Sequence, residues 1–477
     1  MPPPNYFLAT KNLAYGVIAI KFSARGPVRG SSVVIRRGFN YMRPVNVGVI
    51  GLGTVGAGTV DLLSRNSAEI ARRAGRSIRV TQAAVRDMSR VRDCEVSDIR
   101  LTDDPAAITT HPEIDVVLEL MGGEDEAYEV VSTALKNGKH VVTANKALVA
   151  TRGNELFEQA SQAGLVIAFE AAVAGGIPVI KVVRESLAGN RIDGLAGILN
   201  GTCNFILTQI HEQGLDYDAV LTEAQRLGYA EADPYFDVGG VDAAHKLTIL
   251  ASIAFGIPLD FSSVYIEGIE QLRYQDIIYA DELGYRIKHL GIARSDNGHL
   301  DLRVHPCLVE KDQLLANVSG VMNAVRIRGD AVGDALLYGA GAGAKPTASA
   351  VVGDLVDVVR TLTSDPGNRV PHLAFQPHQL ADPRMRPITE ISCAHYLRLT
   401  VRDRPGVLAD VTRILGERHV SIRVISQKGF GDEQGVVPVV IVTHDAKEVD
   451  ISDATRMIET LEANAAPVVR VRVETPD

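Results

Sequence analysis

A short apolar run that leads directly into three spaced glycines constrains the fold of this chain more than any other feature. Val45–Ile50 is typical of a buried strand, and Gly51, Gly53 and Gly56 follow it in the spacing Gly-x-Gly-x-x-Gly. Such glycines permit a tight turn and let the backbone approach a pyrophosphate at the positive end of the next helix. The alternative is a chance glycine turn, but the strand before it favours a dinucleotide site.

Strands and helices alternate after this turn. Three further apolar strands are expected, at residues 78–85, 116–120 and 141–143. Single helices between strands, including one from residue 54 to about 74, indicate βαβ units and a parallel sheet. The sequence therefore predicts an α/β fold with a Rossmann-like domain over residues 44–168. Residues 340–363, a Gly-rich turn and a helix, are expected to complete it.

The end of the second strand bears on the choice of cofactor. An acid there usually bonds the ribose 2′-hydroxyl of NAD, whereas an arginine accommodates the 2′-phosphate of NADP. Arg86 stands at this position and favours NADP, although the adjacent Asp87 leaves NAD open. The alternative is a solvated arginine with no role in binding.

Composition excludes several classes of protein. The chain has 477 residues, with 49 Lys and Arg against 58 Asp and Glu, so its formal net charge is −9. Proteins that bind nucleic acids or anionic membranes carry a basic excess, so neither partner is expected. No apolar run is long enough to span a membrane. The four cysteines form no metal or redox spacing, which is typical of reduced thiols in a cytoplasmic enzyme.

The two ends of the chain differ from the Rossmann-like part. Residues 1–43 are basic and contain no acid, so they are interpreted as a targeting segment or as untranslated upstream sequence with Met42 as the true start. Residues 364–392 are rich in Pro, His and Asp and are expected to form a linker. Residues 393–477 follow the order βαββαβ, which predicts a separable ferredoxin-like module with its own core.

Residues 169–339 are expected to form an α+β catalytic domain, because helices and strands are grouped there. Asp242 and Lys246 are four residues apart on a predicted helix and share one face of it. A buried lysine can act as a general acid or base, and nearby carboxylates suit a substrate ammonium group. The alternative is an exposed ion pair, which would contribute a few tenths of a kcal/mol. His245 lies off this face and is expected to be structural.

Glu170 stands in an apolar, Gly-rich turn that runs to Pro178. An acid in this setting either caps a helix or joins backbone carbonyls as an oxygen ligand of a cation. The residue types alone favour the cap.

Four longer motifs occur together in this chain. The first runs from Glu170 through Gly175-Gly176-Ile177-Pro178 to Asn200-Gly201-Thr202-Cys203-Asn204-Phe205. The second is Leu227-Gly228-Tyr229-Ala230-Glu231-Ala232-Asp233-Pro234, followed by Asp242 and Lys246. The third is Ala144-Asn145-Lys146, and the fourth is Gly341-Ala342-Gly343. As a set they closely resemble the homoserine dehydrogenase family over about residues 44–362, and the first is highly specific. Residues 403–408, Asp-Arg-Pro-Gly-Val-Leu, resemble part of an ACT regulatory domain.

The resemblance implies reversible hydride transfer between L-homoserine and L-aspartate 4-semialdehyde with NADP or NAD. It implies that Lys246 exchanges a proton with the reacting oxygen and that Lys146 is a second catalytic lysine. The two ammonium groups are expected to lower each other's pKa. Substrate would be oriented by Lys146, Glu231 and Asp242. With the glycine turn and Arg86 included, the cofactor-contacting set is Gly51, Gly53, Val55, Gly56, Arg86, Gly122, Lys146, Gly228 and Gly343.

The resemblance also implies a monovalent cation, Na⁺, held by Glu170 and the carbonyls of Val173, Gly175 and Ile177. Its further implications are a role in threonine, methionine and isoleucine biosynthesis, L-threonine as effector of the ACT-like module, and a homodimer or homotetramer. The alternative is that this module only holds subunits together. Two other hypotheses are a different NAD(P) dehydrogenase on a similar fold and a non-catalytic sensor, against which the paired lysines and carboxylates argue.

Overall fold

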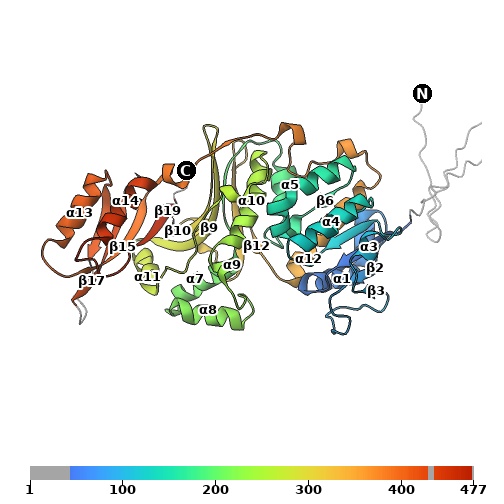
Figure 1. Cartoon of the computed structure of the whole chain (residues 1–477), viewed down its shortest axis with the longest axis horizontal. Coiled ribbons are helices and arrows are strands. Elements are labelled where there is room, and N and C mark those ends of the chain that lie inside the picture. The colour runs from blue at the N-terminus through green and yellow to red at the C-terminus, as the bar shows by residue number, and fades with distance from the viewer. Residues whose placement is uncertain (1–42, 428–434, 475–477) are drawn as a thin grey trace, which may run out of the picture. The chain divides into compact units, whose positions relative to one another are not determined.

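The computed structural model describes residues 43–427 and 435–474 (Figure 1). All elements described here lie in the unit Val45–Asp477. Except for Arg43, the interpretation of residues 1–43 falls outside the described residues. In the described part of the chain, no helix has the length and apolar character needed to cross a membrane.

The first sheet is parallel and has the order β3-β2-β1-β4-β5-β6. Its strands are β1 (Val45–Ile50), β2 (Ile78–Ala84), β3 (Arg100–Thr102), β4 (Val116–Glu119), β5 (His140–Thr143) and β6 (Ile167–Ala168). The predicted Rossmann-like sheet is confirmed. The order reverses beside β1, and the crevice outside the strand ends at such a point is where α/β sheets bind ligands.

Helices cover this sheet. They are α1 (Thr54–Arg65), α2 (Ser67–Ala74), α3 (Ala106–Thr109), α4 (Asp125–Lys136), α5 (Lys146–Gln162) and α12 (Ala344–Thr361). The single helix expected to run to residue 74 is two helices, because the backbone of Asn66 leaves the helical conformation and caps α2. Helix α12 packs on α1 so closely that a Cβ added at Gly58 would lie 2.9 Å from the Ala344 carbonyl oxygen.

The second sheet is mixed, with the order β12-β11-β7-β9-β10-β19-β15-β17-β16. Its catalytic-domain strands are β7 (Ile192–Ile198), β9 (Tyr285–Asp296), β10 (His299–Glu310), β11 (Met322–Gly329) and β12 (Gly333–Ala340), with β8 (Tyr265–Ile266) and β13 (Arg384–Met385) paired to β10. The helices of this domain are α6 (Val179–Lys181), α7 (Gly201–Gln213), α8 (Tyr217–Arg226), α9 (Tyr235–Val238), α10 (Val241–Phe255) and α11 (Tyr274–Glu282). Strand β8 has only two residues, and the sequence pattern did not predict the long β9.

The C-terminal module has the predicted βαββαβ order. It consists of β15 (His395–Arg402), α13 (Val407–Glu417), β16 (Ile422–Gln427), β17 (Val436–Thr443), α14 (Glu448–Glu459) and β19 (Val469–Glu474), with a small pair, β14 (Ser392–Cys393) and β18 (Ala446–Lys447). An apolar cluster that includes Leu399, Val411 and Ile458 forms a core of its own.

This module has the core of its own that was predicted, and it is also joined to the catalytic domain by backbone pairing. Strand β19 runs parallel beside β10, with Leu308 opposite Val473 (Figure 1). A second apolar cluster contains residues from both sides of this junction, among them Ile287, Leu308 and Tyr396. The segment expected to be a plain linker also supplies β13 to the edge of β10. Backbone pairing and shared apolar burial therefore make the catalytic domain and the module one continuous structure.

Candidate active site

A carboxylate held between two ammonium groups lies at the start of α10. Asp242 and Lys246 share one face of this helix and are both buried. The Nζ of Lys246 donates to Asp242 Oδ2 and to the Leu199 carbonyl oxygen, each at 2.7 Å. Lys146 opens α5 directly after β5, and its Nζ lies 3.1 Å from Asp242 Oδ1. Burial excludes the alternative of an exposed Asp242–Lys246 pair.

Two asparagines complete this cluster. Asn200 accepts the Cys203 amide hydrogen to cap α7, while its Nδ2 donates to Asp242 Oδ2 at 2.8 Å and to Asp237 Oδ1 at 2.9 Å. Asn323 donates to the same Leu199 carbonyl oxygen that Lys246 uses, at 2.9 Å. Sequence reasoning assigned no role to Asn200 or Asp237, although both stand in or beside the quoted motifs. Nothing in the sequence indicates that Asn323 belongs to this cluster.

The charges of the cluster stabilise one another. Burial alone would raise the pKa of Asp242, but the charges of Lys246 and Lys146 hold it well below its usual range. Burial opposes the charged form of Lys146, yet the Asp242 carboxylate outweighs it and the pKa of Lys146 is raised. The expectation that two ammoniums lower each other's pKa is therefore wrong for Lys146, because a carboxylate lies between them. Burial raises the pKa of Asp237 against its hydrogen bond from Asn200.

Glu231 lies on the open side of this cluster. Its side chain is exposed, and its charge adds weakly to the raised pKa of Lys146. Phe236, on α9, lies with its ring centre 5.4 Å from the Lys146 ammonium nitrogen. The predicted catalytic and substrate residues Lys146, Glu231, Asp242 and Lys246 are thus brought to one place.

A crevice of about 720 Å³ opens where β4 and β5 end. Val55, Gly122 and Lys146 of the predicted cofactor set line it, together with Glu119 and Asn145. The buried Glu119 accepts hydrogen bonds from Thr143 Oγ1 at 2.5 Å and the Met121 amide at 3.0 Å, which ties the ends of the two strands together. Burial raises the pKa of Glu119. Lys146 belongs to both the crevice and the charged cluster, so the two form one site.

The glycine turn requires glycine for steric reasons. Gly51 has φ +98°, and a Cβ there would lie 2.5 Å from the Leu120 carbonyl oxygen. A Cβ on Gly56 would lie 2.0 Å from the Gly51 carbonyl oxygen, so α1 could not start where it does. Gly53 caps α1 and is open to the outside. This leaves the helix N-terminus accessible to a phosphate group.

The remaining predicted cofactor residues lie outside the crevice lining. Gly343, with φ +112°, caps α12, whose first turn packs on α1 close to the glycine turn. Gly228 lies exposed at the end of α8. Arg86 follows β2, its side chain is 87% exposed, and its Nη2 lies 3.9 Å from Glu126 Oε2. Their contacts with a cofactor stay predictions.

Glu170 has the geometry of a helix cap. Its two carboxylate oxygens accept the amide hydrogens of Ile180 and Lys181, at 2.9 and 2.8 Å, where the short α6 leads into a π-helical turn at Val182–Ser186. Its own amide donates to the buried carboxylate of Asp354 on α12 at 2.7 Å. Burial raises the pKa of Glu170 to about 7 and that of Asp354 to about 8. The cap is therefore supported, and the sodium site stays a prediction.

Comparison with known proteins decides the family. A profile described as homoserine dehydrogenase matches residues 178–356, and one described as the homoserine dehydrogenase NAD-binding domain matches residues 51–170. The homoserine dehydrogenase of Pseudomonas aeruginosa is 58% identical over 433 residues, which are 91% of this chain and 99% of that protein. The chain belongs to the homoserine dehydrogenase family. It is therefore an oxidoreductase, and the resemblance inferred from the motifs is confirmed.

Other homoserine dehydrogenases and an ACT profile agree. The enzyme of Neisseria gonorrhoeae is 49% identical, with 91% of this chain and 99% of that protein covered. The crystal structure of a homoserine dehydrogenase from Thiobacillus denitrificans matches with a TM-score of 0.85 and 55% identity, covering 91% of this chain and 98% of that one. A hyperthermophilic archaeal homoserine dehydrogenase in complex with NADPH matches with a TM-score of 0.56 and 28% identity, covering 66% of this chain and 98% of that one. An ACT domain profile matches residues 395–462.

Proposed function

We propose that this homoserine dehydrogenase interconverts L-homoserine and L-aspartate 4-semialdehyde, with NADP as its preferred cofactor and NAD as the alternative. The observation that carries the proposal is the buried carboxylate of Asp242 between Lys146 and Lys246, beside the crevice of the NAD-binding domain. Arg86 at the end of β2 supports NADP, as does the archaeal homoserine dehydrogenase in complex with NADPH.

The cofactor, when bound, supplies or accepts the hydride, and the chain's own groups manage the proton and the charge. Lys246 uses two of its three N–H groups on Asp242 and Leu199, which leaves one for the reacting oxygen. In the direction of aldehyde reduction, the charged Lys246 donates a proton to the forming alkoxide. In the direction of alcohol oxidation, the same nitrogen must first be neutral to accept it.

The carboxylates divide the remaining work. Asp242 already accepts from three donors, those of Lys146, Lys246 and Asn200, so it acts by orienting the two lysines toward the substrate. Glu231 is exposed and lies near Lys146, which makes it available for the substrate ammonium group. Lys146 faces both the crevice and the cluster and therefore contacts cofactor and substrate.

We also propose that the enzyme serves threonine, methionine and isoleucine biosynthesis, that its ACT domain binds L-threonine, and that it works as a homodimer or homotetramer. The ACT match and the family support these statements. A Na⁺ ion remains part of the proposal. The carboxylate of Glu170 is used as a cap, and the Ile177 carbonyl accepts from the Val179 amide at 2.7 Å, so the carbonyls of Val173 and Gly175 would contribute most. We assign the ion no step in the reaction.

The experiment that tests the proposal follows nicotinamide absorbance with L-homoserine and with each cofactor. Lys246→Ala is expected to lower kcat by roughly 10²- to 10⁴-fold with a small change in KM, because a proton-transfer group acts in the transition state. The matched control is Lys136→Ala, an exposed lysine at the end of α4. Activity of the Lys246 variant within about threefold of wild type would contradict the assignment.

A further inference from the structure

The carbonyl oxygen of Leu199 accepts hydrogen bonds from two side chains that come from different elements. Lys246 Nζ donates to it at 2.7 Å, and Asn323 Nδ2 donates to it at 2.9 Å. Asn323 lies on β11 beside Leu199, because the adjacent residues Ala324 and Ile198 are partners in the antiparallel pairing of β11 with β7. Asn323 therefore binds the same oxygen as the lysine that exchanges the proton in the proposed reaction.

The position of this oxygen sets the direction in which the ammonium group of Lys246 points. An ammonium group has three N–H donors. Lys246 uses two of them, on Asp242 Oδ2 and on the Leu199 carbonyl oxygen, and these two bonds fix the direction of the third. Because the third donor is the one left for the reacting oxygen, a shift of the Leu199 carbonyl would turn it away from the substrate.

Stability alone does not explain an asparagine at position 323. The residue is 1% exposed, and its buried Oδ1 accepts no hydrogen bond from the residues that the structure describes. A buried acceptor without a partner costs at least as much free energy as one ordinary hydrogen bond contributes. An apolar side chain of the same shape would therefore be at least as stable here, so the value of Asn323 lies in its N–H donor.

A glycine turn leaves the space that the Asn323 amide occupies. A Cβ added at Gly341 would lie 2.1 Å from Asn323 Cγ and 2.4 Å from its Nδ2, so any larger residue would displace the amide. The φ of Gly341 is not positive, so its backbone alone would accept an alanine. Gly343, a predicted cofactor residue, follows in the same turn and caps α12. Asn323 thus packs between this turn and the Leu199 carbonyl.

We propose that Asn323 is a positioning residue for proton transfer. Its N–H donor fixes the Leu199 carbonyl oxygen, which directs the remaining N–H of Lys246 toward the substrate. Gly341 contributes by leaving the space that the amide needs. The inference rests on the proposed function, in which Lys246 exchanges the proton, and it adds two residues from outside the charged cluster to that step.

Asn323→Leu keeps the branched shape of the side chain and removes its donor. At a temperature well below both thermal midpoints, kcat for homoserine oxidation is expected to fall roughly ten- to hundredfold. KM for homoserine and for the cofactor should change by less than about threefold, because only the proton-transfer step is affected. The thermal midpoint should equal or exceed that of wild type, since the unpartnered Oδ1 is removed. An unchanged kcat, or a loss of kcat together with a lower thermal midpoint, would overturn the proposal.

Gly341→Ala keeps the donor of Asn323 but displaces it, so kcat should fall by a similar factor. In Asn323→Ala the three atoms nearest to a Cβ at position 341 are absent, and an alanine there has no amide to displace. The double variant Asn323→Ala/Gly341→Ala should therefore be no slower than Asn323→Ala alone. Losses that multiply in the double variant would show that Gly341 acts independently of Asn323, which would overturn its part in the proposal.

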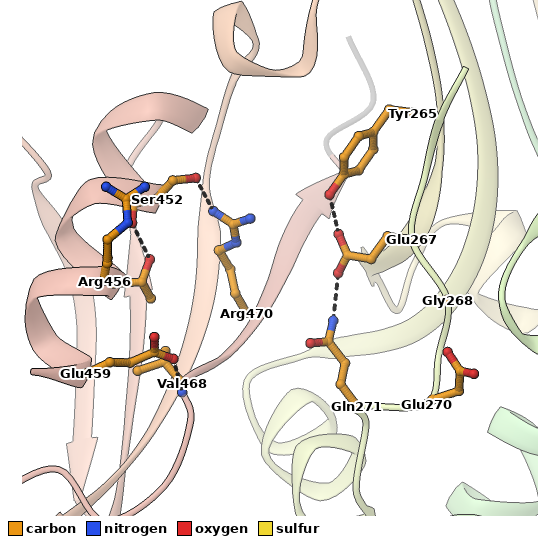
Figure 2. Close-up of a pocket in the computed structure, with 11 residues that line it drawn as sticks. Tyr265, Glu267, Gly268, Glu270, Gln271, Ser452, Arg456, Glu459, Val468 and Arg470 are labelled. Carbon is orange, nitrogen blue, oxygen red and sulfur yellow. Dashed lines mark hydrogen bonds between the residues drawn. The ribbon is translucent and has the colours of Figure 1, made fainter. Parts of the chain in front are cut away.

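The matched control is Gln271→Ala, which also removes a side-chain amide that donates a hydrogen bond. Gln271 is exposed and donates to Glu267 Oε1 at 2.6 Å (Figure 2). It lines a cavity between residues 265–271 and the ACT domain, and this cavity shares no residue with the active-site crevice. The control should leave kcat and KM unchanged. A loss of kcat equal to that of Asn323→Leu would overturn the proposal.

Competitive acetylation of lysines tests the proposal without using the reaction. A trace of acetic anhydride acetylates neutral amines, and mass spectrometry gives the extent of acetylation at Lys246 relative to the exposed Lys136. In Asn323→Leu and in Gly341→Ala this ratio should rise, because the Leu199 carbonyl oxygen no longer restrains Lys246. An unchanged ratio in both variants would overturn the proposal. A wild-type enzyme that does not oxidise homoserine would instead refute the proposed function, which the acetylation ratio does not use.

Discussion

Asp242→Asn removes the negative charge that lies between the two lysines and keeps the size of the side chain. The Nζ of Lys146 and of Lys246 lie 3.1 and 2.7 Å from its two oxygens. An asparagine offers one oxygen acceptor and brings two N–H donors toward groups that already donate. At least one ammonium group is therefore left facing a donor in a buried site.

The expected cost follows from how deeply each partner is buried. Removing one member of a buried ion pair costs roughly 3–5 kcal/mol. The side chain of Lys146 is 33% exposed and can recover water, whereas that of Lys246 is 11% exposed and cannot. We therefore expect the lower end of the range, about 3 kcal/mol, with most of the loss at Lys246.

The loss has a defined dependence on pH. The pKa of Asp242 is lowered in the folded state. Its contribution to the free energy of unfolding is therefore present above its pKa in the unfolded chain, about 4, and is lost as the pH falls below that value. Thermal midpoints of wild type and variant should differ by a constant amount from about pH 5 to 8 and converge at lower pH. The alkaline limb of kcat should move to lower pH, because burial then dominates the pKa of Lys146.

Asp218→Asn, an exposed acid in the first turn of α8, is the control and should change neither quantity. An Asp242→Asn variant with the wild-type thermal midpoint and the wild-type pH profile would refute this account. It would mean that Asp242 does not hold Lys146 charged.

Three further outcomes are expected. Arg86→Asp should lower the ratio of kcat/KM for NADP to that for NAD by about tenfold or more, since a guanidinium can bond a 2′-phosphate; an unchanged ratio would show that Arg86 does not contact it. The pKa of Asp354 is raised to about 8, so its contribution to the free energy of unfolding is present below pH 4 and is lost as the pH rises through 8. The thermal midpoint of Asp354→Asn should therefore fall less than that of wild type toward pH 9. Parallel curves of thermal midpoint against pH would contradict this. Truncation after Pro377 should yield an aggregating, inactive protein, because it exposes the edge of β10 and the buried Leu308; a monodisperse, active fragment in size-exclusion chromatography and the absorbance assay would show that the junction is dispensable.

The sequence predicts best the parts of this fold that depend on local physics. The glycine turn could be predicted from the sequence, because only glycine tolerates the backbone conformation of Gly51 and the close approach of the Gly51 carbonyl oxygen to Gly56. The pairing of Asp242 with Lys246 followed from helical spacing alone. That Lys146 would join them did not follow from spacing, since it comes from a different domain, and it was predicted only through the family resemblance.

The parts that were missed depend on tertiary burial of polar groups. Strand β9 contains Lys288 and His289, both buried, and these polar residues interrupt the apolar pattern by which strands are recognised. Asn323 donates a hydrogen bond to the Leu199 carbonyl oxygen, which is more than a hundred residues away in sequence, and no sequence spacing predicts such a contact. The C-terminal module had a correct internal order, but its attachment through β19 depends on a neighbour that lies outside its own sequence pattern.

The pairing of β19 with β10 sets an order of events during synthesis. The ribosome adds β19 about 160 residues after β10, which at 5–20 residues per second is roughly 8 to 30 s later. During that interval β10 is the last strand of the catalytic part of the sheet, and its edge is open at Cys307–Val309, where it can pair with other chains. We therefore expect nascent chains stalled before β19 to be the species most prone to aggregation, and slower translation of that segment to increase aggregation during overexpression.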